Sequence, residues 1–94
     1  MLESKQSVVQ TKSAIMEAMH SLPRTLIQNQ TEDYIHYTQR TRLLGFVDDI
    51  EFYFPEGAQT IQYRSSSRVG HGDMGTNEKR IHTFAYHYNN AQVD

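Results

Sequence analysis

A helical repeat of apolar residues runs through the first part of the chain. The residues that share this face are Val8, Ala14, Ile15, Ala18, Met19 and Leu22. Lys12 and Glu17 fall on the opposite side, which is the arrangement of an amphipathic helix packed against a core. Pro23 disfavours helical backbone angles in the residue before it, so the pattern predicts a helix over residues 7–22.

Alternating apolar and polar residues then predict four strands. The segments are RTLIQN at 24–29, DYIHYTQ at 33–39, VDDIEFYF at 47–54 and TIQYRSSS at 60–67. Pro55 and Gly57 suit a turn between the last two strands. Gly45 stands ahead of the third strand, where it can supply a backbone angle that other residues avoid.

The third and fourth strands define a register. In the third strand one face carries Ile50, Phe52 and Phe54, and the other carries Asp49, Glu51 and Tyr53. In the fourth strand Ile61 and Tyr63 form the apolar face. Superposing the two apolar faces in an antiparallel pair places Glu51 opposite Arg64, and it places Asp49 opposite Ser66. The second face of this pair is therefore expected to be polar and matched in charge.

Helical spacing returns near the end of the chain, at Ile81, Phe84, Ala85 and Tyr88, with Thr76 or Asn77 as N-cap candidates. The segment HTFAYHY also suits a strand, and we prefer the helix. The order helix, four strands, helix predicts an α+β two-layer sandwich. In it an antiparallel four-stranded sheet carries the N-terminal and C-terminal helices on one face. One domain over residues 1–94 is expected, with disordered tails at 1–6 and 89–94.

Composition narrows the functional classes. The chain has 94 residues, 37% of them hydrophobic, and a net charge of -2, so a folded core is expected and a general attraction for nucleic acid is not. The absence of cysteine excludes disulfides, thiolate metal sites and a cysteine nucleophile. No apolar run has the length of a membrane span, so this chain is not expected to insert into a membrane. A cytoplasmic location is the default expectation, and a membrane-peripheral or exported one follows if a targeting segment has been removed.

Three consecutive motifs carry a family resemblance. GFVDDIEFYF, followed by IQYRSSSRVGHGDMGTNEKR, resembles the bacterial and plastid family called "domain of unknown function 1499". The matching positions are Gly45, Phe46, Val47, Asp48, Asp49, Glu51, Phe52, Arg64, Ser65, Ser67, Arg68, Gly70, Asp73, Gly75, Asn77 and Arg80. The likeness covers roughly residues 14–82, including an upstream SLPRTLIQNQTEDYIHYTQRT segment. It implies a fold neighbourhood and a set of residues, but no activity.

Two features depart from the family pattern. Family members often begin with a cysteine-containing segment, a signal or a membrane anchor, and the sequence pattern predicts none of these here, which leaves the location open. The segment after the Asn-x-x-Arg step reads IHTFAYHYNN, whereas the family's helix is charged there.

The charged residues of these motifs, together with Asn77, form the candidate site. They are Asp48, Asp49, Glu51, Arg64, Arg68, Asp73, Asn77 and Arg80. The favoured interpretation is a structural network, because the arginine fork pairs bidentately with carboxylates. The resemblance implies that Asp48 and Asp49 belong with Arg64 and Arg68.

Two functional hypotheses stand beside this network. In the first, Arg64 and Arg68 bind a small anion together with backbone N–H groups of the Gly70–Gly75 loop. In the second, a divalent cation assists hydrolysis, held by Asp48, Asp49, His71 and Asp73. The spacing matches no recognised metal motif, so no catalytic residue, metal or cofactor is assigned.

The leading functional hypothesis is a small non-enzymatic binding module. The sequence lacks a recognised catalytic signature, and its compact charged motif suits contact with a protein partner or a small anion. An accessory subunit of a larger complex, of membrane or plastid type, is one form of this hypothesis. Nucleic acid is not an expected partner, and the oligomeric state stays open.

Overall fold

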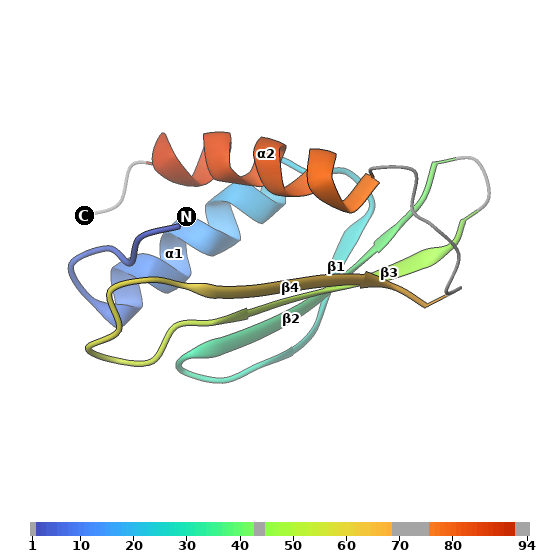
Figure 1. Cartoon of the computed structure of the whole chain (residues 1–94). Coiled ribbons are helices and arrows are strands. Elements are labelled where there is room, and N and C mark those ends of the chain that lie inside the picture. The colour runs from blue at the N-terminus through green and yellow to red at the C-terminus, as the bar shows by residue number, and fades with distance from the viewer. Residues whose placement is uncertain (1, 43–44, 69–75, 92–94) are drawn as a thin grey trace.

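The computed structural model describes residues 2–42, 45–68 and 76–91 and shows a two-layer α+β fold (Figure 1). The elements in chain order are α1 (Val8–His20), β1 (Thr25–Gln30), β2 (Tyr34–Arg40), β3 (Val47–Tyr53), β4 (Gln62–Ser67) and α2 (Thr76–Asn89). Both helices lie on the same side of the sheet (Figure 1). The predicted fold class and both predicted helices are confirmed.

The four strands form one antiparallel sheet in the order β1-β2-β3-β4. In the β3–β4 pair, Glu51 faces Arg64 and Asp49 faces Ser66, so the predicted register is confirmed. A bulge interrupts the β1–β2 pair between Ile27 and Asn29. Neighbouring strands are antiparallel. The C-terminal ends of β2 and β4 therefore lie beside the N-terminal ends of β1 and β3, at one end of the sheet.

The helices bury one face of the sheet. The core contains Ala14, Ile15, Ala18 and Met19 from α1, Ile35, Tyr37, Ile50 and Phe52 from the sheet, and Phe84 and Tyr88 from α2. Phe52 lies at the centre of an aromatic cluster, with its ring centroid 4.7 Å from that of Phe84 and 5.5 Å from that of Tyr63. Burying these side chains is the main source of stability, and it leaves the opposite face of the sheet without helices.

Local chemistry sets the boundaries of the first helix and the turns. The Ser7 side chain accepts a hydrogen bond from the backbone of Gln10 and so caps the start of α1. Gly45 has φ of 69° and Gly57 has φ of 85°, angles that glycine adopts without strain, as expected at both turns. The predicted capping of α2 by Thr76 or Asn77 concerns side chains outside the described part of the structure and stays a prediction.

The segment before α1 packs against the sheet. Leu2 is buried, Glu3 forms an isolated bridge with Thr60, and the backbone N–H of Ile61 donates to the Leu2 carbonyl at 3.0 Å. The Tyr88 hydroxyl donates to the Glu3 carbonyl at 2.6 Å. The expectation of disordered tails at 1–6 and 89–94 stays a prediction, and these contacts argue against it at the first end. No described helix is long and apolar enough to cross a membrane.

Candidate functional site

The sheet separates the two adjacent carboxylates of the GFVDD motif. Successive residues of a strand point to opposite faces. Asp48 is 1% exposed and points toward the helices, whereas Asp49 is partly exposed on the open face. They therefore belong to two different side-chain networks.

Asp48 forms a buried ion pair with α2. The Arg80 Nη2 atom lies 2.5 Å from Asp48 Oδ2, and both side chains are almost inaccessible to solvent. Arg80 Nη1 also donates to Ser65 Oγ at 2.7 Å, and its Nε donates to the side-chain oxygen of Gln39. One guanidinium thus connects α2 to β2, β3 and β4. These contacts support a structural role for Asp48 and Arg80. The predicted ligand-binding role of the two residues stays a prediction.

The chemistry of this pair explains why arginine stands there. A buried charge needs a partner and satisfied hydrogen bonds, because its desolvation is costly. The planar guanidinium of Arg80 offers several N–H donors in fixed directions, which the carboxylate of Asp48, the Gln39 amide oxygen and the Ser65 hydroxyl accept. A lysine at this position would have a single nitrogen to present.

Asp49 belongs to a second network on the open face. Its Oδ2 accepts from Arg68 Nε at 2.9 Å and its Oδ1 accepts from Arg68 Nη2 at 3.0 Å, a bidentate pair. His36 Nε2 lies 2.8 Å from Asp49 Oδ1. The Arg68 guanidinium lowers the pKa of the Asp49 carboxyl, and the His36 hydrogen bond acts in the same direction.

A neighbouring contact extends this surface along the sheet. The Tyr34 hydroxyl donates to Glu51 Oε1 at 2.6 Å, and this bond is the main cause that raises the pKa of Tyr34 to about 12. Arg64 stands opposite Glu51 in the register, as predicted, and is exposed. Within the described part of the chain, however, Glu51 is paired to Tyr34 and forms no ion pair with Arg64.

The predicted set of eight site residues thus divides. Asp48 and Arg80 lie under α2, whereas Asp49, Glu51, Arg64 and Arg68 lie on the open face. Asp73, His71 and the Gly70–Gly75 loop lie outside the described residues, as does the side chain of Asn77. Their predicted roles stay predictions.

The geometry bears on the hydrolase hypothesis. Asp48 and Asp49 face opposite sides of the sheet, so the two carboxylates cannot hold one cation between them. Among residues 2–42, 45–68 and 76–91, no group of three or more histidine, aspartate and glutamate side chains is placed to hold a metal ion.

The family model described as "Protein of unknown function (DUF1499)" matches residues 2–87. The chain belongs to this family. Comparisons with curated proteins and with solved structures give no match. Membership of the DUF1499 family confirms the resemblance carried by the three motifs and assigns no activity.

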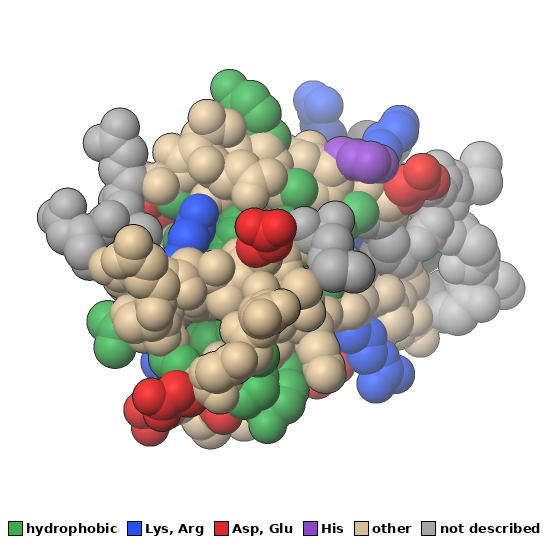
Figure 2. All heavy atoms as spheres, turned by 60° about the vertical axis from the view of Figure 1, so that its left-hand side comes forward, with side chains coloured by type: hydrophobic (Ala, Val, Ile, Leu, Met, Phe, Trp, Pro, Cys, Tyr) green, Lys and Arg blue, Asp and Glu red, His purple; other side chains and the backbone are tan. Residues whose placement is uncertain are grey.

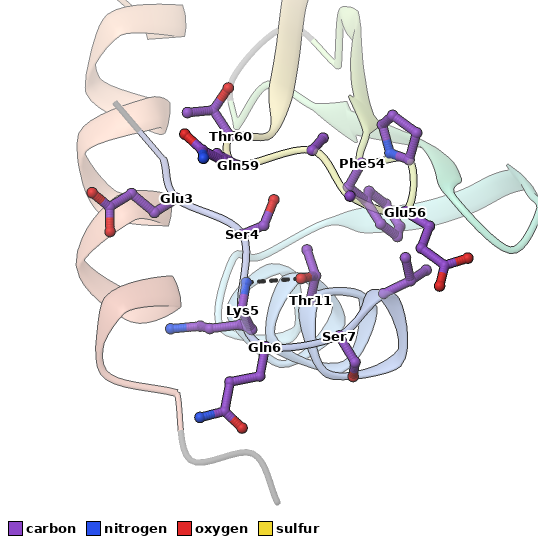
Figure 3. A pocket seen from close by; sticks show the side chains of 14 residues that line it. Glu3, Ser4, Lys5, Gln6, Ser7, Thr11, Phe54, Glu56, Gln59 and Thr60 are labelled. Carbon is purple, nitrogen blue, oxygen red and sulfur yellow. Dashed lines mark hydrogen bonds between the residues drawn. The ribbon is translucent and has the colours of Figure 1, made fainter.

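A hollow beside the start of α1 in this DUF1499 chain lies away from both networks. Its volume is about 770 Å³, and its lining comes from the segment before α1, the start of α1 and the β3–β4 loop (Figure 3). Its charged lining residues are Glu3, Lys5 and Glu56, and Lys5 Nζ is already placed 4.5 Å from the centre of the Tyr88 ring. On the face in Figure 2, the described acidic and basic side chains are scattered rather than grouped by sign. The lining has mixed charges and no concentration of one sign, so the volume of this hollow is not enough to make it the candidate functional site.

Four members of the two networks were not among the predicted site residues of this DUF1499 chain: Tyr34, His36, Gln39 and Ser65. Tyr34 and His36 alternate with buried Ile35 and Tyr37, which places them on the face that carries Asp49 and Glu51. Each contacts the carboxylate diagonal to it across the β2–β3 pair. The alternation within β2 could be recognised in the sequence. The β2–β3 register, which decides the partners of Tyr34 and His36, could not.

Proposed function

We propose that this DUF1499 chain is a non-enzymatic binding module whose binding surface is the open face of the sheet, and that its partner is a protein. The observation that carries the proposal is the one-sided packing of the sheet, with both helices on one face and an ordered polar network on the other (Figure 1). The Asp48–Arg80 pair supports the fold beneath this surface.

The residue types on the open face support a protein partner. Tyrosine and arginine are enriched at protein interfaces, and this face carries Tyr34, Tyr53, Arg64 and Arg68. Tyr53 is 42% exposed. The carboxylates of Asp49 and Glu51 are already hydrogen-bonded within the surface. A partner that covers them would therefore not strand an unpaired charge.

The finer form of the proposal makes the chain an accessory subunit of a larger complex of membrane or plastid type. Its support is the resemblance to a family whose members often carry anchors or targeting segments. The metal-assisted hydrolase is not proposed, because the sheet separates its two adjacent carboxylates.

A matched pair of tyrosine variants tests the surface. Tyr53→Asp alters the open face, and Tyr86→Asp alters an equally conspicuous tyrosine on α2, where Tyr86 is 66% exposed. The tagged chain is used to capture proteins from an extract of its native cells. Each captured protein is then purified, and its affinity for the wild-type and variant chains is measured.

The proposal predicts a protein that binds Tyr53→Asp at least tenfold more weakly than wild type and binds Tyr86→Asp within about twofold. Circular dichroism shows whether both variants keep the fold. Equal binding to both variants, or a loss confined to Tyr86→Asp, would overturn the open face as the binding surface.

A further inference from the structure

A hollow of about 430 Å³ lies at one end of the open face. It is lined by Arg24, Thr25, Leu26, Gln28, Thr38, Arg40, Val47 and Arg68. The lining comes from the start of β1, the end of β2, the start of β3 and the residue after β4. The antiparallel topology brings these four chain positions to the same end of the sheet, so three arginines far apart in sequence converge on one hollow.

Two of these arginines keep unused donors. Arg24 Nε donates to the Arg40 carbonyl at 3.0 Å, and Arg40 Nη1 donates to the Gly45 carbonyl at 3.2 Å. Among the residues that the structure describes, no carboxylate pairs with Arg24 or Arg40. Both residues are exposed, and their guanidinium groups retain N–H groups that can bind an oxyanion.

The backbone at Arg24 adds a second observation. Its φ is 58°, a left-handed conformation that glycine or asparagine adopts more easily than arginine. The Arg24 carbonyl accepts from the Arg40 backbone N–H at 3.1 Å, which holds this turn against the end of β2. Arginine is uncommon in this conformation, which makes Arg24 a candidate for a functional role.

The charges in and beside the hollow favour a dianion. Arg24, Arg40 and Arg68 carry three positive charges, and Asp49, bonded to Arg68, carries one negative charge. The local balance is +2 in a chain whose net charge is -2. Leu26, which is 65% exposed, and Val47 supply an apolar wall beside the guanidinium groups.

We propose that this hollow binds a phosphate-monoester group whose organic part lies against Leu26 and Val47. Arginine forks match the geometry of phosphate oxygens, and a phosphate monoester is largely dianionic at neutral pH. The volume is in the range of small-molecule sites. The group can come from a free organic phosphate or from a phosphorylated side chain. The site goes beyond the proposed function, because it assigns a phosphate ligand to a hollow that Tyr53 does not line.

The test uses nuclear magnetic resonance titrations of the full chain with phenyl phosphate, at fixed ionic strength because exposed charges are screened by salt. A saturable change confined to the amides of Leu26, Thr38, Val47 and their neighbours is expected. Malonate, a dianionic dicarboxylate, is expected to bind at least tenfold more weakly. A parallel titration with a phosphoserine tripeptide distinguishes the two sources of the phosphate group. Tighter binding of phenyl phosphate indicates a free organic phosphate, and tighter binding of the tripeptide indicates a phosphorylated side chain.

Matched arginine variants locate the site. Arg40→Ala and Arg24→Gly are each expected to weaken phenyl phosphate binding about tenfold or more, the effect of losing charge-assisted hydrogen bonds. Arg24→Gly also removes the left-handed arginine, so its fold should be retained. Arg64→Ala, an exposed strand arginine on the same face but outside the hollow, should bind within about twofold of wild type.

Three results would overturn the proposal: no saturable binding, malonate binding as tight as phenyl phosphate, or an equal loss in Arg64→Ala and Arg40→Ala. Tyr53 does not line the hollow. Partner binding that depends on Tyr53, together with any of these results, would therefore reject the phosphate site and leave the proposed function standing.

Discussion

Asp48 and Asp49 are consecutive in the chain, yet Asp48 pairs with Arg80 inside the domain and Asp49 pairs with Arg68 on the open face. The pleat of β3 is the cause, because it directs neighbouring side chains to opposite sides of the sheet. The two adjacent carboxylates of this motif therefore have different roles: Asp48 is structural, and Asp49 belongs to the surface. Each role leads to a distinct prediction.

The open-face pair predicts a specific dependence on pH. Asp49 has a pKa lowered from 3.8 by the Arg68 hydrogen bonds, so its carboxylate contributes stability above its unfolded pKa. That contribution is lost as the pH falls through the folded pKa. Urea unfolding of wild type and Asp49→Asn between pH 6 and about pH 2 should show a shallower acid loss in the variant. Identical acid profiles would contradict this assignment.

The buried pair predicts that lysine cannot replace arginine at position 80. Arg80→Lys keeps the charge but loses the fork that reaches Gln39, Ser65 and Asp48 together. Leaving buried acceptors unpaired should lower the free energy of unfolding by about 1–3 kcal/mol. Arg64→Lys, on an exposed arginine, is the control and should stay within about 0.5 kcal/mol of wild type. Similar values for the two variants in urea unfolding would argue against the network.

The hydrogen bond from Tyr88 of α2 to the Glu3 carbonyl is expected to stabilise the segment before α1. Tyr88→Phe removes the hydroxyl that donates to the Glu3 carbonyl and should cost about 0.5–1.5 kcal/mol of unfolding free energy. Hydrogen exchange should become faster at the amides of Ser4 and Ile61, which hold this segment to the sheet. Rapid exchange at both amides already in the wild-type chain would instead favour the disordered tail expected from the sequence.

Local patterns predicted much of the fold. The alternation in residues 47–54 and 60–67 placed Glu51 opposite Arg64 and Asp49 opposite Ser66, and both pairs are present. This worked because one face of each strand is apolar and a slip by one residue would bury the charged face. The two helices followed from the same kind of repeat.

The partners of the charged residues were harder to predict, because they depend on how α2 docks. Asp48 and Arg80 are 32 residues apart, and no local repeat relates them. One signal was readable: Arg80 precedes Phe84 by one helical turn, so it lies on the buried face of α2 and needs a buried partner. The arginine hollow was missed for a similar reason, since only the complete sheet brings Arg24 and Arg40 beside Arg68.

The separation of the two carboxylates is tested most directly by the unfolding free energies of Asp48→Asn and Asp49→Asn, measured side by side at pH 7. Asp48→Asn leaves the buried Arg80 without a charged partner and should lose about 3–5 kcal/mol. Asp49→Asn alters a partly exposed pair and should lose at most about 1 kcal/mol. Equal losses, or a larger loss in Asp49→Asn, would contradict the division into a structural and a surface carboxylate.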